Sequence, residues 1–227
     1  AMDPAINAAA CRVLDRIGLS VKNVPGTGCC GALSLHLGAS EEARQAMRRN
    51  IDAWWPHVEA GIEAIVMTAS GCGVTVREYA ELLADDEQYA EKARQISKLT
   101  RDIAEVIYDG EHEPLQAPAG IRVAFHSPCT LQHGQGIRGK VEAVLRAAGA
   151  ELVPVADSHL CCGAAGTYSL LQPALSEQLL SNKLGHLQQH KPQVIVSANI
   201  GCLVHLAGEA TVPVRHWIEL IDPSPPG

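Results

Sequence analysis

The chain contains the same cysteine motif twice, about 130 residues apart. Residues 28–32 read Gly-Cys-Cys-Gly-Ala, and residues 160–164 read Leu-Cys-Cys-Gly-Ala. A further cysteine follows an Ile-Val run in each copy, at Cys72 and at Cys202. A single duplication at this spacing predicts two similar domains rather than a solenoid of short repeats.

The expected boundary between the two domains is the segment 111–120. Pro114, Pro118 and Gly120 interrupt the helical and strand periodicities there. The first domain is therefore expected at residues 1–110 and the second at residues 121–227. A chain of 227 residues is long enough for both domains to bury a core.

The second copy alternates short apolar runs with helical patterns. Strands are expected at residues 122–126, 152–155 and 194–198, with helices at 140–148 and from Pro173 onward. This order predicts an α/β fold of two Rossmann-like domains, each with a short, mostly parallel sheet flanked by helices.

The cysteines of the second copy all follow a predicted strand. In open parallel sheets, the loops beyond the carboxyl ends of the strands form the ligand crevice. Four thiols are therefore expected to meet at one edge of the sheet, namely Cys129, Cys161, Cys162 and Cys202.

The first copy follows the same plan with one part missing. A helix is expected from Pro4 to Gly18, capped by Asp3, followed by a strand at 19–24, a helix at about 41–60 and a strand at Ile65-Val66. The repeat places the counterpart of Cys129 just before Ala1. The chain is therefore expected to be a piece of a longer protein whose first domain has lost its first strand and cysteine. Cys11 is expected to pack at the edge of the first helix's apolar stripe rather than to bind metal.

Composition narrows the class of protein. The formal net charge of −7 argues against a nucleic acid partner. There is no apolar run of about 18 residues and no signal peptide, so a soluble, cytoplasmic chain is expected. In a reducing compartment, eight cysteines favour metal or redox chemistry over disulfides.

Adjacent cysteines can act together only in an irregular turn, because successive side chains on a strand point to opposite faces. Gly31 and Gly163 permit such a turn. Its backbone N–H groups favour thiolates and can donate to cluster sulfurs. Three alternatives remain at this point, which are simple packing of buried thiols, a redox-active disulfide and a four-thiolate zinc site. The short C-x-x-C spacing usual for zinc is absent.

The pattern of Cys129, then Cys161-Cys162-Gly163, then Cys202 after a strand resembles the CCG cysteine-rich domain. That domain occurs in heterodisulfide reductases, in lactate-utilisation proteins and in glycolate oxidase iron-sulfur subunits. The last of these is the most similar over several stretches, at residues 48–56, 66–73, 128–133, 161–169, 198–202 and 214–219.

The resemblance implies an iron-sulfur subunit that passes electrons from a flavin (FAD) subunit, where glycolate becomes glyoxylate, toward a membrane acceptor. The implied cofactor is an iron-sulfur cluster of the 4Fe-4S type. The complex would associate peripherally with the inner face of the plasma membrane. The motif maps onto two ligand sets, Cys129, Cys161, Cys162 and Cys202 in the second domain, and Cys29, Cys30 and Cys72 in the first.

One departure from the heterodisulfide reductase motif matters for the chemistry. That motif ends in C-x-x-C and supplies five thiols, whereas Asn199 and His205 flank Cys202 here. Four thiols suit an electron-transfer cluster better than a disulfide-reducing one. A thiol/disulfide reductase module or a structural zinc domain is the alternative function.

Three histidines are candidate hydrogen-bond donors to the ligands. His126 and His133 flank Cys129, and His205 follows Cys202 by one helical turn. The sequence contains no set of nucleophile, base and orienting residue and no convincing phosphate-binding loop. Substrate oxidation is therefore expected in a partner subunit, and this chain alone is not expected to be catalytic.

Overall fold

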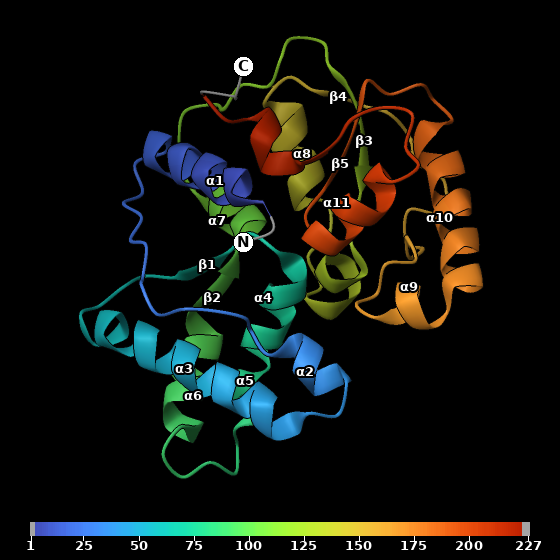
Figure 1. Ribbon diagram of the computed structural model, residues 1–227. Helices are drawn as coiled ribbons and strands as arrows, with labels where there is room; N and C mark the ends of the chain where they lie inside the picture. The colour runs from blue at the N-terminus through green and yellow to red at the C-terminus, as the bar shows by residue number, and fades with distance from the viewer. Residues whose placement is uncertain (1–2, 224–227) are drawn as a thin grey trace. The chain divides into compact units, whose positions relative to one another are not determined.

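The computed structural model of the protein describes residues 3–223 (Figure 1). The chain forms two compact units. The central unit is Lys22–Asp102, and the C-terminal unit combines the residues up to Val21 with those from Ile103 onward. Both units are α/β, with short parallel sheets flanked by helices, as predicted.

The C-terminal unit is built on a four-stranded parallel sheet. Its strands lie in the order β4-β3-β5-β6 and are β4 (Glu151–Leu152), β3 (Arg122–His126), β5 (Val194–Ser197) and β6 (Val214–His216). The two central strands pair with Val123 opposite Val194 and His126 opposite Ser197. Both are almost wholly buried, which explains their continuous apolar runs.

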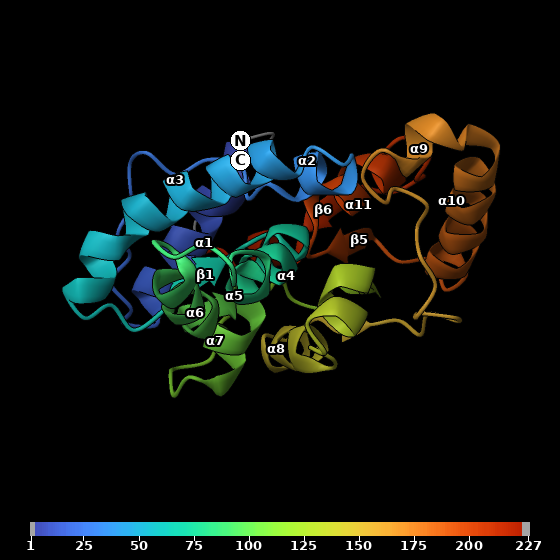
Figure 2. The same ribbon diagram turned by 90° about the horizontal axis from the view of Figure 1, so that it is seen from below.

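Helices cover both faces of this sheet, as right-handed crossovers require. Figures 1 and 2 show α8 (Lys140–Ala147) on one face, and α10 (Pro173–Gln188) and α11 (Ile200–Ala207) on the other. The remaining elements are α7 (Ile103–Asp109), the π-helical turn η1 (Thr130–Gly134), α9 (Tyr168–Leu171) and the 3-10 turn η2 (Trp217–Leu220). Between α7 and β3, residues 110–121 form neither helix nor strand.

Helix α1 (Pro4–Arg16) packs within the C-terminal unit. Its start is capped by the Asp3 carboxylate, which accepts a hydrogen bond from the Ala5 N–H at 3.0 Å. Its buried stripe contacts η2, and the Arg12 guanidinium donates to the buried Asp222 carboxylate at 2.9 Å. Because of this packing, α1 belongs to the C-terminal compact unit. The domain boundary expected at residues 111–120 was derived from the sequence repeat and stays a prediction. Cys11 is exposed, so the expectation that it packs into the stripe is wrong.

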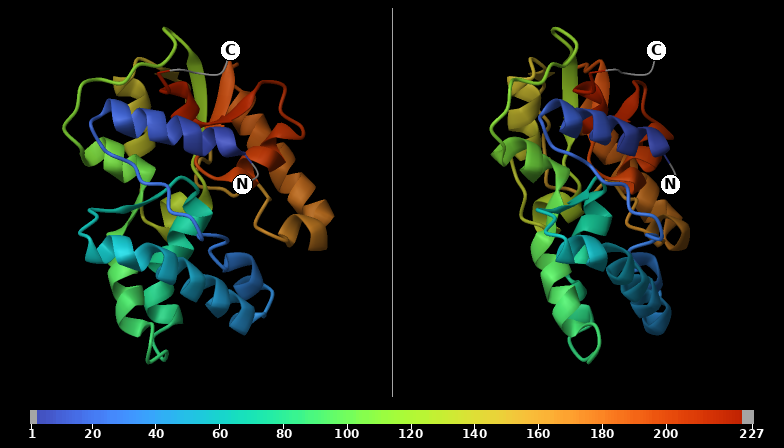
Figure 3. Two further views of the ribbon diagram at one scale, coloured as in Figure 1. Left: turned by 60° about the vertical axis from the view of Figure 1, so that its left-hand side comes forward. Right: turned by 90° about the vertical axis from the view of Figure 1, so that its left-hand side faces the viewer.

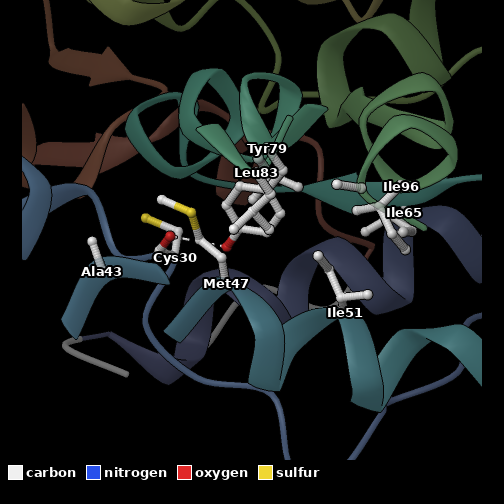
Figure 4. Close-up of a cluster of buried hydrophobic side chains, with 10 residues drawn as sticks. Cys30, Ala43, Met47, Ile51, Ile65, Tyr79, Leu83 and Ile96 are labelled. Atoms are coloured by element: carbon white, nitrogen blue, oxygen red, sulfur yellow. Dashed lines mark hydrogen bonds between the residues drawn. The ribbon is translucent and has the colours of Figure 1, made fainter. Parts of the chain in front are cut away.

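The central unit contains a two-stranded parallel sheet of β1 (Ile65–Met67) and β2 (Thr100–Asp102). Its helices are α2 (Ala32–His36), α3 (Ser40–Glu59), α4 (Ser70–Arg77), α5 (Tyr79–Leu82) and α6 (Ala90–Leu99). The 20-residue α3 runs along this unit and packs against α6 (Figure 3). The core between them includes Met47, Ile51, Tyr79 and Ile96 (Figure 4).

The strand expected at residues 19–24 is not formed. Leu19 and Val21 are 36% and 44% exposed, so this segment has no buried face. Within residues 3–223, no neighbouring strand pairs with it, and an unpaired extended segment gains no ladder of hydrogen bonds. None of the helices in this range is both long and apolar enough to cross a membrane.

Candidate metal centre

The carboxyl ends of β3 and β5 form the point where the C-terminal sheet changes direction. From β3 the chain crosses to β4 on one side, and from β5 it crosses to β6 on the other. Ligands of open α/β sheets bind in the crevice at such a switch point. His126 ends β3 and Ser197 ends β5, so the residues that follow them lie at this crevice.

Four cysteines reach this edge from three segments. Cys129 directly precedes η1, and Cys202 lies in the first turn of α11. Cys161 and Cys162 lie in the second cysteine loop, defined here as residues 153–167, between β4 and α9. The predicted convergence of these thiols is therefore present, and Cys202 follows β5 as expected.

The four sulfurs form a chain of thiol contacts. The Cys129 and Cys162 thiols donate to Cys161, which lowers the pKa of Cys161 and raises the pKa values of both donors. The pKa of Cys202 lies well below its usual range, chiefly because its sulfur is also in hydrogen-bonding contact with Cys162. The site therefore favours thiolate, the form that binds metal, beside neighbouring thiols.

Two neighbouring groups further support the sulfurs. The Gly163 N–H donates to the Cys161 Sγ at 3.3 Å. The Asn199 side-chain amide donates to the Cys202 Sγ at 3.7 Å. Hydrogen bonds of this kind stabilise thiolates and cluster sulfurs.

His126 was expected to act beside Cys129, but its ring lies close to Cys162 and Cys202. Its side chain is 1% exposed, and neither ring nitrogen has a hydrogen bond of ordinary geometry. A ring nitrogen and the Sγ atoms of Cys162 and Cys202 all lie within 4.8 Å of one another, and the imidazole helps to lower the pKa of Cys202. Among residues 3–223, this is the one such group of three metal-ligating side chains. A buried imidazole without a well-made hydrogen bond is costly, so a metal ion or a cluster sulfur would satisfy it.

The other two candidate histidines contact oxygen atoms of other residues. His133 is exposed, and its Nε2 contacts the His159 carbonyl at 3.2 Å. The His205 Nε2 lies 3.3 Å from the Ser176 hydroxyl, which donates to the Gly163 carbonyl at 2.9 Å. His205 therefore acts on the backbone beside Cys162 through Ser176, a residue that sequence reasoning did not identify.

The motif glycines allow each cysteine loop to approach a helix closely. Gly163 has φ +98°, and a Cβ there would lie 2.5 Å from the Ser176 carbonyl oxygen of α10. Gly31 has φ +90°, and its Cβ would lie 2.8 Å from the Ala43 carbonyl oxygen of α3. The same close approach in both units explains why glycine follows the cysteine pair each time.

The central unit brings together the three cysteines of the first motif. Cys29 is exposed, Cys30 is buried, and Cys72 is half-buried in the first turn of α4. The Cys72 thiol donates to Cys30 and lowers the pKa of Cys30 to about 6. This unit therefore also favours a thiolate beside a second thiol.

Buried polar side chains hold the first cysteine loop, defined here as residues 22–31. The Asn50 side chain accepts from the Gly28 N–H at 2.8 Å and donates to the Cys29 carbonyl at 2.9 Å. The Tyr79 hydroxyl donates to the Cys30 carbonyl at 2.9 Å (Figure 4). Neither residue was recognised as part of the site from the sequence.

Tyr79→Phe is expected to destabilise the chain by about 1–3 kcal/mol, because the buried Cys30 carbonyl loses its hydroxyl partner. Tyr89→Phe is the matched control, since the Tyr89 hydroxyl bonds to Asp52 on the exposed surface. Its expected cost is below about 0.5 kcal/mol. Denaturant unfolding of both variants measures the difference, and equal costs would contradict the role of Tyr79 in the loop.

Comparison with known proteins gives the family. Residues 1–77 and 123–207 match the CCG cysteine-rich domain, and the chain belongs to this family. The two matched segments contain the seven motif cysteines, Cys29, Cys30, Cys72, Cys129, Cys161, Cys162 and Cys202.

Among curated proteins, the chain is a homologue of the glycolate oxidase iron-sulfur subunit of Escherichia coli K12. The two are 51% identical over 97% of this chain, which spans 54% of that relative's length. Lactate utilization protein A of Shouchella clausii and that of Bacillus subtilis are each 26% identical over 96% of this chain and 92% of their own length.

Proposed function

We propose that this chain is an iron-sulfur electron-transfer subunit of a glycolate-oxidising complex. The observation that carries the proposal is the chain of four thiols at the switch point of the C-terminal sheet. Sequence identity favours glycolate over lactate as the substrate of the complex, since 51% with the glycolate oxidase relative exceeds 26% with the lactate utilization proteins. The partners of this chain are then the flavin (FAD) subunits that oxidise glycolate, and the complex delivers electrons at the inner face of the membrane.

The proposed ligands of a 4Fe-4S cluster are the four thiols of the C-terminal unit, Cys129, Cys161, Cys162 and Cys202. Thiolates are the usual ligands of such clusters, and the contacts that favour thiolate among these four sulfurs support this donor set. When bound, the cluster accepts and releases single electrons. Cys29, Cys30 and Cys72 offer three thiols with one exposed, so we propose a weaker second site in the central unit.

The protein's own residues hold and shield this centre. Cys162 and Cys202 are 1% and 7% exposed, which keeps water from the inner thiols. The Gly163 N–H and the Asn199 amide direct their protons at sulfur, which stabilises negative charge there. His126 supplies a further donor or ligand beside Cys162 and Cys202.

The second candidate is a zinc site, favoured by the compact group of His126, Cys162 and Cys202. Histidine and cysteine are the usual zinc ligands, and Cys161, in contact with Cys162, offers a fourth ligand. Zinc gives no visible absorption and takes no electrons. The two candidates therefore differ in every optical and redox measurement.

Mixing the anaerobically reconstituted chain with the flavin-bearing subunit and glycolate is expected to bleach the visible absorption of the cluster. Electrons have to arrive from the partner, because this chain has no residues suited to abstracting the substrate hydrogen. The chain with glycolate alone is expected to keep its spectrum. The same mixture with lactate tests the choice of substrate.

Two results of this experiment would contradict the proposal. One is bleaching by glycolate in the absence of the flavin subunit. The other is an unchanged spectrum in its presence while the flavin itself becomes reduced.

A further inference from the structure

Lys183 is a charged residue in the middle of a buried helix face. Its side chain is 2% exposed, and Leu180, Leu184 and Leu187 of the same face are also buried. Lysine is almost never fully buried unless a partner compensates the charge. The buried ammonium group of Lys183 therefore needs a specific partner that compensates its charge.

The hydrogen bonds of Lys183 do not neutralise its charge. The Nζ atom donates to the Asp157 carbonyl at 2.8 Å and to the Ser158 carbonyl at 3.4 Å, and both acceptors are uncharged. The Asp157 carboxylate is 55% exposed and lies 3.8 Å from the His186 ring. Solvent therefore screens the nearest acidic group.

Leu180 and Leu184, which lie on either side of Lys183 on α10, pack in one buried cluster with Cys162 and Cys202, so this ammonium lies near the thiols at the switch point. Burial lowers the pKa of Lys183, and the thiols Cys129, Cys162 and Cys161 oppose that effect more than Asp157 does. The ammonium of Lys183 therefore lies on the side of α10 that packs against the second cysteine loop, which carries Cys161 and Cys162.

The central unit has a neutral side chain at the equivalent position. The carbonyl groups of Ala43 and Ser176 each face the motif glycine of their unit. Two helical turns further along α3 and α10 lie Asn50 and Lys183, both buried. Each bonds to the cysteine loop of its own unit, but Asn50 does so with an amide and Lys183 with a cation.

We propose that Lys183 is the buried countercharge of the metal centre in the C-terminal unit and that it raises the reduction potential of the bound cluster. The inference rests on the proposed function. A cluster held by thiolates is anionic, and reduction adds one more negative charge. In a site of low dielectric, a nearby fixed cation stabilises the reduced state more than the oxidised state.

The test is a redox titration of the reconstituted full chain as wild type and as Lys183→Gln. Glutamine keeps a donor for the loop carbonyls and imitates the amide of Asn50, while it removes the charge. The equilibrium constant for one-electron reduction is expected to fall at least tenfold, which corresponds to about 59 mV toward more negative potential. Lys183→Met is the second variant and is expected to shift the potential in the same direction.

Arg122→Met is the matched control. Arg122 also donates to two backbone carbonyls, those of Lys191 at 3.0 Å and His190 at 2.7 Å. It lies at the opposite end of β3 from His126 and is 39% exposed. Removing its charge is expected to change the equilibrium constant by less than about twofold, because distance and solvent screen it.

Four results would overturn the inference, and they differ in what else they affect. An unshifted potential in Lys183→Gln overturns it alone, and so does an equal shift in Arg122→Met. Loss of the cluster from a folded Lys183→Gln chain would show that Lys183 only holds the second cysteine loop in place. A wild-type chain that takes up no iron and sulfide overturns the proposed function together with this inference.

Discussion

Cys162→Ser is expected to abolish the visible absorption of the reconstituted chain and to reduce bound iron at least tenfold. Cys162 is central in the thiol chain, since its sulfur contacts both Cys161 and Cys202. It also belongs to the compact group with His126. Serine has nearly the same size, so the loss arises from the missing sulfur rather than from a cavity.

Cys11→Ser is the matched control for this prediction. Cys11 is exposed on α1 and belongs to neither Cys-Cys-Gly motif. Its replacement is expected to leave iron content and spectrum unchanged. Circular dichroism and unfolding show whether both variants are folded. A folded Cys162→Ser chain with the wild-type spectrum would exclude Cys162 as a ligand.

Gly163→Ala is expected to be the most destabilising single methyl addition in the C-terminal unit, at about 2–4 kcal/mol. The residue has φ +98°, and the new Cβ would lie 2.5 Å from the Ser176 carbonyl oxygen. That oxygen belongs to the backbone of α10, so it cannot move aside without shifting the helix. The second cysteine loop would move instead, which would displace both of its thiols.

Gly149→Ala separates the cost of the left-handed backbone conformation from the cost of the close contact with Ser176. Gly149 has φ +92°, but a Cβ there would meet nothing within 4 Å. It therefore bears only the cost of the left-handed conformation, about 1 kcal/mol. Denaturant unfolding of the metal-free chains gives both values. Equal losses in the two variants would show that the contact with Ser176 is unimportant.

The sequence was sufficient to predict the elements that depend on local pattern. The strands at 122–126 and 194–198 and the helix from Pro173 have strong apolar periodicity and clear ends, and all three are present. The meeting of the second-copy cysteines followed from a general rule about parallel sheets, and it too is present. The strand expected at 19–24 was wrong because a strand also needs a neighbour, which local pattern does not reveal.

The finer structure of the site depends on tertiary contacts that the sequence does not encode locally. His126 was considered because it lies near Cys129 in the chain, yet its close neighbours are Cys162 and Cys202. Lys183 did carry a signal, since it interrupts the buried stripe of Leu180, Leu184 and Leu187. Only the fold shows that this interruption faces the cysteine loop rather than solvent.

The central claim is that the thiols of the C-terminal unit hold an iron-sulfur cluster. Anaerobic purification or reconstitution followed by iron, sulfide and zinc analysis tests it most directly. We expect about four iron atoms and about four sulfides bound per chain in the C-terminal site, with broad visible absorption. A folded chain that binds stoichiometric zinc, or no metal at all, under conditions that load other iron-sulfur proteins would contradict it.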